Sequence, residues 1–250
     1  MGLQYALASI MTTISNNLQA VRARIARACA ACGRQPGDVR LLAVSKTFGA
    51  DAVRQAVRAG QTAFGENYIQ EAVEKITALA AAGPTRLQWH CIGPIQSNKT
   101  QLVARHFDWA HTVDRLKISQ RLNEQRPREL APLDVCIQVN VDGGATKSGA
   151  SPEEAMELAL TVAKLPRLRL RGVMSIPDPL PDFDAQYAIH RRVREVFDAI
   201  ADRLPAGHEG FDTLSLGMTA DLEAAIHAGS TMVRVGSGIF GARHYAAVPT

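Results

Sequence analysis

Short apolar runs alternate with helical patterns eight times along this chain. The runs that predict strands are 40–48, 63–64, 87–92, 107–112, 133–141, 168–174, 213–216 and 231–235. Every run but the last is followed by a helical pattern, and no hairpin signal joins two runs. Strict strand–helix alternation favours a parallel sheet. Eight such units in 250 residues predict an α/β fold of the closed (β/α)₈ TIM-barrel type.

An extra helix is expected before the first strand. Its apolar positions recur at helical spacing from Thr12 or Ser15 to Gly33, at Ile14, Leu18, Val21, Ile25 and Cys29. We expect this helix to close the bottom of the barrel. Residues 1–11 carry no periodic signal and end on a second methionine, Met11. They are interpreted as a poorly ordered start-site extension, and residues 12–250 as one barrel domain.

Composition excludes several classes of protein. The net charge of +4 is spread along the chain, which gives little support for nucleic-acid binding and modestly favours small anions. No apolar stretch reaches the ~18 residues that a membrane span needs. The N-terminus lacks the pattern of a signal peptide, so a cytoplasmic protein is expected. Cys29 and Cys32 form a C-x-x-C without a second ligand pair, so no metal site is expected. The cysteines are expected to be reduced thiols.

One lysine stands at the end of the first predicted strand. The run Leu41–Val44 is apolar, and Lys46 follows it after Ser45. In a β/α barrel the carboxyl ends of the strands face the active site. A partly desolvated lysine there has a lowered pKa, which frees its amine for Schiff-base chemistry. The alternative is a lysine that reaches solvent from a strand end.

The last two strands end in glycine-rich segments. Gly217 to Thr219 opens a helix, and Gly236 to Gly238 follows the eighth strand. Barrels commonly bind phosphate between the loops after strands seven and eight. A phosphate site opposite a lysine suits pyridoxal phosphate. Gly236, Gly238 and Gly241 also spell the dinucleotide motif G-x-G-x-x-G. We reject that interpretation, because too few residues follow for the acidic partner ~20 positions on.

Seven blocks in order resemble the pyridoxal phosphate homeostasis proteins, single-domain relatives of the alanine racemase barrel. The blocks are LLAVSKT, FGENYIQEA, WHCIGPIQSNK, TKSG, LRGVMSIP, LSLGMTADLEAAI and MVRVGSGIFGAR. The resemblance covers about Thr12 to Tyr245 and implies an alanine racemase N-terminal-domain-like barrel, which is pyridoxal phosphate fold type III.

The resemblance also implies roles for seven residues. Lys46 would carry the cofactor as a Schiff base, and Arg234 would lie at or near its ring nitrogen. Asn67 would lie near the ring, and the phosphate would bind Ser215, Thr219, Gly236 and Ser237. The family often has threonine in place of Ser237, which also offers a hydroxyl. Lys147 is either a second basic residue at the mouth or a solvated loop charge, and His90 is expected to be a hydrogen-bonded strand residue.

The implied function is intracellular homeostasis of vitamin B6 cofactor and of amino and 2-oxo acids, without strong catalysis. An arginine at the ring nitrogen makes the ring a poorer electron sink than a carboxylate would. Nothing in the sequence places Tyr245 at the mouth as a second base. Two alternatives stay open: an amino-acid racemase with Lys46 as base, and a cofactor-independent Schiff-base aldolase. Pyridoxal-dependent apo-enzymes are candidate recipients of the cofactor, and the composition permits a monomer.

Overall fold

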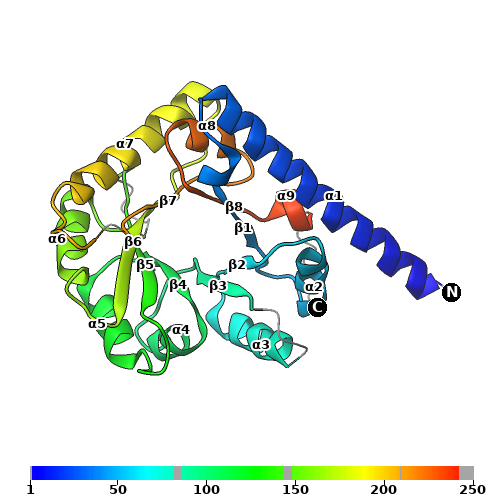
Figure 1. Ribbon diagram of the computed structural model, residues 1–250, viewed down its shortest axis with the longest axis horizontal. Coiled ribbons are helices and arrows are strands. Elements are labelled where there is room, and N and C mark those ends of the chain that lie inside the picture. The colour runs from blue at the N-terminus through cyan, green and yellow to red at the C-terminus, as the bar shows by residue number, and fades with distance from the viewer. Residues whose placement is uncertain (1, 82–85, 144–147, 209, 242–250) are drawn as a thin grey trace, which may run out of the picture.

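Eight parallel strands form a closed barrel in a computed structural model of the chain (Figure 1). The structure describes residues 2–81, 86–143, 148–208 and 210–241, so Lys147 and Tyr245 lie outside it. The strands follow each other in sequence order, and β8 pairs with β1. Their bounds are β1 Arg40–Val44, β2 Ala63–Glu66, β3 Gln88–Cys91, β4 Trp109–Val113, β5 Leu133–Gln138, β6 Leu168–Met174, β7 Thr213–Ser215 and β8 Met232–Val235. The predicted barrel is confirmed.

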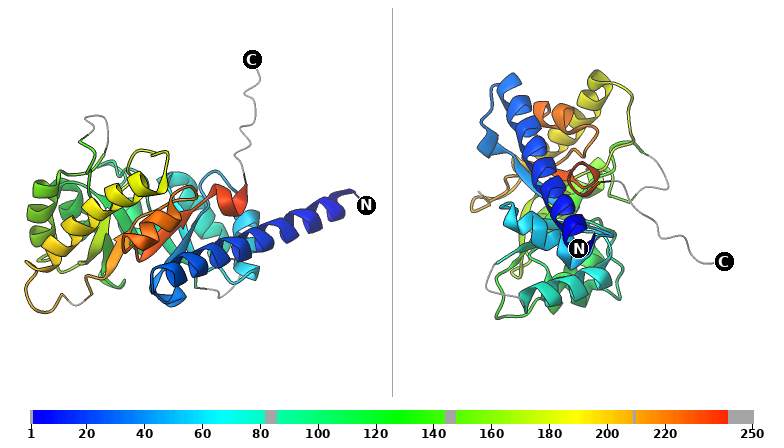
Figure 2. Two further views of the ribbon diagram at one scale, coloured as in Figure 1. Left: turned by 90° about the horizontal axis from the view of Figure 1, so that it is seen from above. Right: turned by 90° about the vertical axis from the view of Figure 1, so that its right-hand side faces the viewer.

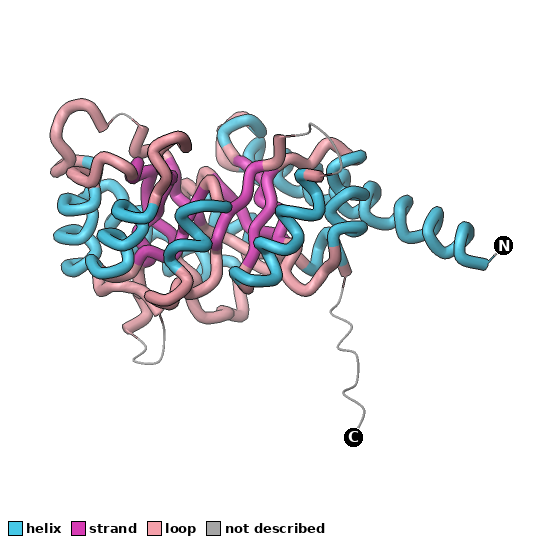
Figure 3. The backbone as a smooth tube through the Cα atoms, turned by 90° about the horizontal axis from the view of Figure 1, so that it is seen from below, coloured by secondary structure: helices cyan, strands magenta, loops and turns pink. Residues whose placement is uncertain are grey.

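Helices surround the barrel and connect its strands (Figure 3). They are α2 Ala50–Arg58, α3 Ile69–Ala80, α4 Thr100–His106, α5 Leu116–Gln125, α6 Pro152–Val162, α7 Phe183–Ala201 and α8 Leu222–His227. Two short helical turns were not predicted: η1 Pro36–Asp38 before β1, and α9 Ser237–Phe240 after β8. The last strand is therefore followed by a helix after all.

The first helix, α1 Gly2–Ala31, lies along the side of the barrel and not across its bottom (Figure 2). It packs against α2, α8 and α9, where Asn17 Nδ2 donates to the carbonyl of Ile239 at 2.9 Å. The expectation of a bottom plug was wrong, because α1 fills the gap in the helical ring between α8 and α2. The helix also begins at Gly2, earlier than expected, and the start-site extension stays a prediction. Among the described helices, none is long and apolar enough to cross a membrane.

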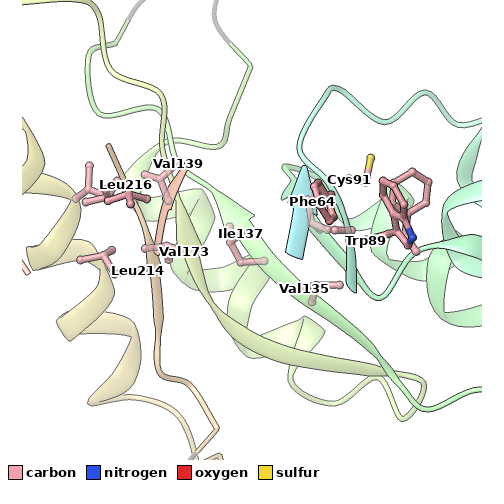
Figure 4. Packing of buried hydrophobic residues seen from close by; sticks show 14 of the residues in the cluster. Phe64, Trp89, Cys91, Val135, Ile137, Val139, Val173, Leu214 and Leu216 are labelled. Atoms are coloured by element: carbon pink, nitrogen blue, oxygen red, sulfur yellow. The ribbon is translucent and has the colours of Figure 1, made fainter. Parts of the chain in front are cut away.

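Side chains of each strand alternate between the helical layer and the barrel interior, as the pleat of a strand requires. Outward residues such as Val135, Ile137 and Val173 belong to one continuous apolar cluster that also includes the buried faces of the helices (Figure 4). Two smaller clusters fill part of the interior. One contains Leu42, Val44, Ile92 and Met232, and the other contains Trp109, Cys136 and Met174. The rest of the interior is polar, and the site is built on it.

Candidate functional site

A cavity of about 270 Å³ opens at the carboxyl ends of the strands. Its walls come from the ends of β1, β2, β3, β6, β7 and β8 and from the loops that follow them. The lining residues are Val44, Lys46, Phe48, Asn67, Ile92, Ile176, Met218, Thr219, Ala220, Arg234, Gly236, Ser237 and Gly241. Six of the seven residues singled out from the sequence thus meet at one cavity, and Ser215 is the exception.

Arg234 forms the floor of the cavity and is buried, with only 3% of the residue exposed. Its Nη1 donates to the carbonyl oxygen of Ser215 at 2.5 Å and to Ser215 Oγ at 2.8 Å. Its Nη2 donates to the carbonyl of Ser175 at 2.8 Å. No carboxylate among the described residues is hydrogen-bonded to it. Burial lowers the pKa of Arg234 to about 10, so the group is still a cation at neutral pH.

Ser215 lies beneath Arg234 and not on the cavity wall. The residue is fully buried, and its Oγ accepts from Arg234 and lies 3.1 Å from His111 Nδ1. Its neighbours Leu214 and Leu216 belong to the outer apolar layer, so alternation along β7 turns Ser215 into the interior. Direct contact between Ser215 and a phosphate does not fit this placement. We therefore assign Ser215 to the support of Arg234.

The loop after β7 brings Thr219 to the cavity. Gly217 has φ +89°, and a Cβ there would lie 2.6 Å from Ala225 Cβ, so the turn requires glycine. Asp221 closes the loop by accepting from the Met218 N–H at 2.6 Å, while its other oxygen lies 3.0 Å from His190 Nε2. Burial alone would raise the pKa of Asp221, but these two hydrogen bonds bring it below its usual value. An ionised carboxylate thus holds the loop.

Two hydroxyl groups stand together on one side of the cavity. Ser237 Oγ donates to Thr219 Oγ1 at 3.3 Å, which joins the loops after β7 and β8. The close approach depends on Gly238, where a Cβ would lie 3.1 Å from Thr219 Cγ2. Paired hydroxyls on neighbouring loops are suited to hold phosphate oxygens, since each can donate one hydrogen bond.

Lys46 is half-buried and lines the cavity. The next residue, Thr47, has φ +68°, the one non-glycine residue with positive φ among those the structure describes. A β-branched residue in this region is strained. Its N–H donates to Glu71 Oε1 at 3.2 Å, so α3 holds the turn that presents Lys46.

A buried ion pair supports the same turn from behind. Lys75 Nζ lies 2.6 Å from Glu66 Oε1 and donates to the carbonyl of Ser45 at 3.0 Å. Ser45 Oγ also donates to Glu66 Oε1, at 2.6 Å. Burial raises the pKa of Glu66 even though Lys75 and Ser45 oppose the shift. We refer to Ser45, Glu66, Glu71 and Lys75 as the β1–β2 clamp. The sequence contained one sign of it, because Lys75 falls on the buried face of α3 with Ile69 and Ala72.

Asn67 enters the cavity wall at a point of close backbone contact. A Cβ on Gly93 would lie 2.2 Å from the carbonyl oxygen of Asn67, so only glycine permits the two loops to approach. Asn67 Oδ1 is buried and has no hydrogen-bond partner within the described ranges. An unpaired buried acceptor is costly, and this one borders a cavity that a polar ligand could fill.

Sequence reasoning missed the apolar part of the wall. Phe48, Ile92, Ile176 and Met218 face the cavity, and Phe48 stacks on Phe240 with ring centroids 5.2 Å apart. Single apolar residues after strands give no distinctive signal. His90 is a hydrogen-bonded interior residue, as expected, with contacts to Gln88 and His111 and no place on the cavity wall.

Comparison with known proteins agrees with this architecture. Residues 16–244 match the family model described as alanine racemase, N-terminal domain. The chain is 54% identical over 235 residues to the pyridoxal phosphate homeostasis protein of Escherichia coli. The matched region covers 94% of this chain and 99% of that protein. It is 54% identical over 237 residues to the protein of that name from Pseudomonas aeruginosa, with 95% and 99% covered.

Solved structures give the same result. PipY of Synechococcus elongatus, solved with pyridoxal phosphate bound, superposes with a TM-score of 0.78 at 31% identity, and the match covers 91% of this chain and all of PipY. Alanine racemase from Corynebacterium glutamicum shares only the fold, with a TM-score of 0.62 at 18% identity over 96% of this chain and 63% of that enzyme. The chain therefore belongs to the pyridoxal phosphate homeostasis protein family, on the barrel of the alanine racemase N-terminal domain.

Proposed function

We propose that this protein binds pyridoxal 5′-phosphate in the cavity at the carboxyl end of the barrel, with Lys46 as the covalent anchor through a Schiff base. One observation carries the proposal: a lysine, a buried arginine and a pair of hydroxyls converge on one small cavity. These groups match an aldehyde, a ring nitrogen and a phosphate, which are the three polar parts of the cofactor.

The residues present fit the group in their hydrogen-bonding capacity and in their apolar surface. Thr219 and Ser237 would receive the phosphate, with the backbone of Gly236 beside them. Arg234 uses three of its five N–H donors on Ser215 and Ser175, so its Nε–H and one Nη2–H are available for an acceptor in the cavity. Asn67 Oδ1 would gain the partner that it lacks among the described residues. Ile92, Ile176 and Met218 offer an apolar surface to the ring.

The wall supports binding more than catalysis. When bound, the cofactor supplies an electron sink for carbanions. Arg234 would donate to the ring nitrogen without protonating it, which would keep the sink weak. Among the described lining residues, Lys46 is the one side chain that can act as a base at neutral pH. An amino-acid racemase needs a second base on the opposite face of its substrate, and the described wall offers none.

The cellular role follows from the family. The curated relatives are named pyridoxal phosphate homeostasis proteins. We extend that role to this chain as intracellular handling of vitamin B6 cofactor and of the amino and 2-oxo acid balance. Within the proposal the protein is a cytoplasmic monomer that can release its cofactor to pyridoxal-dependent apo-enzymes. Sedimentation of the purified protein tests the monomer, and reactivation of an apo-enzyme by the loaded protein tests the transfer.

The decisive experiment compares wild type with Lys46→Ala. Added pyridoxal phosphate is expected to give wild type a new absorbance band, which Lys46→Ala lacks. Borohydride reduction and peptide mass spectrometry should then locate the label on Lys46 in wild type. Lys117→Ala, at an exposed lysine of α5 that does not line the cavity, is the matched lysine control and should keep the band. Equal spectra for wild type and Lys46→Ala would overturn the anchor. Rapid exchange of the α-hydrogen of an added amino acid would favour the racemase.

A further inference from the structure

A chain of side-chain hydrogen bonds crosses the barrel interior beneath the cavity. It begins where Arg234 Nη1 donates to Ser215 Oγ at 2.8 Å. Ser215 Oγ lies 3.1 Å from His111 Nδ1, and His111 Nε2 lies 2.9 Å from His90 Nδ1. The chain ends where His90 Nε2 meets Gln88 Oε1 at 3.1 Å. We call Ser215, His111, His90 and Gln88 the interior chain.

The chain spans the barrel rather than following its sheet. His111 lies on β4 and Ser215 on β7, and these strands are not neighbours in the closed sheet. Their side chains can therefore meet only across the interior. Both histidines and Ser215 are fully buried, while Gln88, at the amino end of β3, is exposed. The chain thus links the floor of the cavity to the opposite end of the barrel.

Burial keeps both histidines neutral at physiological pH. It lowers the pKa of His111 to about 3, with the nearby charge of Arg234 acting in the same direction. It also lowers the pKa of His90 well below the usual range, with smaller contributions from His111 and Arg40. A neutral imidazole carries one proton, so one ring nitrogen donates and the other accepts.

The orientation of the Gln88 amide sets the direction of the bonds. The structure turns Gln88 Oε1 toward His90 Nε2, and with that acceptor in place His90 carries its proton on Nε2 and leaves Nδ1 as an acceptor. His111 must then donate from Nε2 and accept at Nδ1. The proton that His111 accepts comes from Ser215, whose Oγ presents a lone pair to Arg234. Each member of the interior chain therefore turns its acceptor side toward the guanidinium.

We propose that the interior chain positions Arg234 and supports its positive charge with aligned neutral dipoles, so that the guanidinium is presented to a ring nitrogen in the cavity. The ionised Asp221 also supports this charge, but it makes its hydrogen bonds to Met218 and His190. This inference rests on the proposed function for the identity of the ligand. A carboxylate in the same position would neutralise the cation and pull it away from the cavity. Neutral dipoles hold it without competing for its charge.

The same geometry makes His111 a positioning residue and not a proton carrier. Its Nδ1 lone pair is engaged by Ser215, and it does not line the cavity. A substitution should therefore act through the orientation of Arg234. His111→Leu removes the acceptor for Ser215, whereas His111→Asn keeps an amide oxygen close to the place of Nδ1.

The first test reads the tautomers directly in the protein without cofactor. Two-dimensional ¹⁵N–¹H NMR of the side chains, assigned with His90→Asn and His111→Asn, should show His90 and His111 as neutral Nε2–H tautomers at pH 7. A proton on Nδ1 of His111 would reverse the chain and overturn the proposal. This result does not depend on pyridoxal phosphate, so it stands even if the proposed function fails.

The second test measures the Kd of pyridoxal phosphate by absorbance titration. Ser215→Ala removes a hydrogen bond to the charged guanidinium, and His111→Leu removes the acceptor that orients Ser215 toward it. Each should raise Kd by about 10-fold. His111→Asn should stay within about 3-fold of wild type. Met174→Leu, in the interior but outside the chain, is the control for packing and should leave Kd unchanged.

The outcomes are separable. An unchanged Kd in both His111→Leu and Ser215→Ala would overturn the proposal. An equal increase of Kd in His111→Leu and His111→Asn would show that His111 acts through packing and not by positioning Arg234. If His111→Leu does not fold, Ser215→Ala decides. Failure of wild type to bind the cofactor would instead overturn the proposed function and leave the tautomer result as the test of the chain.

Discussion

The two sides of the sheet differ in what fills them. Between strands and helices lies one continuous apolar layer, in which Phe64 packs on Trp89 with ring centroids 5.6 Å apart. Inside the barrel, the apolar clusters are small and separated by a buried arginine, two histidines and a serine joined by hydrogen bonds. The outer layer has the composition of a stabilising core, whereas the interior holds charge and dipoles at the base of the cavity.

This difference means that substitutions can change the stability of the protein and its binding of ligand separately. Apolar burial is not directional, so the outer layer can lose volume without moving the cavity. The interior bonds are directional and converge on Arg234, so their loss reaches the site even where stability changes little. We therefore expect substitutions on the two sides to affect different measurements.

The largest effect on stability is expected in the outer layer. Phe64→Ala should reduce the free energy of unfolding by about 3–5 kcal/mol, because it empties a fully buried site. Urea denaturation measures this change, and the Kd of pyridoxal phosphate for the folded protein should stay as in wild type. A weaker Kd without lost stability would break the distinction between the two sides.

The β1–β2 clamp sharpens the comparison, since it places charge on the outer side of the sheet. Lys75→Met should cost about 3 kcal/mol, because it leaves Glu66 ionised or forces it to take up a proton in a buried place. It should also weaken binding of pyridoxal phosphate, since Lys75 holds Ser45 next to Lys46.

The control for the clamp is the double variant Lys75→Met, Glu66→Gln. It removes the unpaired charge and should recover part of the lost stability, as measured by urea denaturation. Recovery of stability without recovery of Kd would show that the clamp positions Lys46. A normal Kd in Lys75→Met alone would limit the clamp to stabilising the sheet.

The last effect is a pH dependence that belongs to the interior, and within one pH unit below pH 6.5 it is the smallest of the three. His90 and His111 take up protons below about pH 6.5 when unfolded, but stay neutral when folded, His111 down to a pKa of about 3. The unfolded state then binds more protons, so stability is present above pH 6.5 and is lost as pH falls toward 3. Each histidine contributes about 1.4 kcal/mol per pH unit. Urea denaturation at several pH values gives the free energy of unfolding as a function of pH, and its slope should be shallower for His111→Asn than for wild type. Equal slopes would mean that His111 takes up its proton in the folded protein as readily as in the unfolded one.

Much of the fold could be predicted, because the apolar pattern of the sequence shows which side chains pack between the strands and the helices. The sixth strand, Leu168–Met174, was predicted to the residue. The first was predicted too long, because the strand ends at Val44 and Thr47 turns the chain at positive φ. No periodicity announces such a turn. The position of α1 was also missed, since the apolar face of a helix does not tell which neighbour covers it.

The part of the site that depends only on the order of the strands could be predicted from the sequence. Residues that follow the strands, such as Lys46, Thr219 and Ser237, meet at one mouth whatever the details of the barrel. Contacts across the interior depend on how the strands are staggered, which the sequence does not reveal. The bond between His111 and Ser215 could not be foreseen for that reason, and Ser215 was assigned to the phosphate.

The position of α1 has a consequence for synthesis on the ribosome. Its partners include Glu223, which pairs with Arg24 Nε at 2.8 Å, and Ile239, whose carbonyl binds Asn17. Helix α1 therefore waits for a partner that lies 222 residues further along the chain, and β1 likewise waits for β8. Until then the nascent chain exposes an apolar helix face and an open sheet edge, both of which attract other chains. Closure of this barrel thus waits until β8 has been made and can pair with β1.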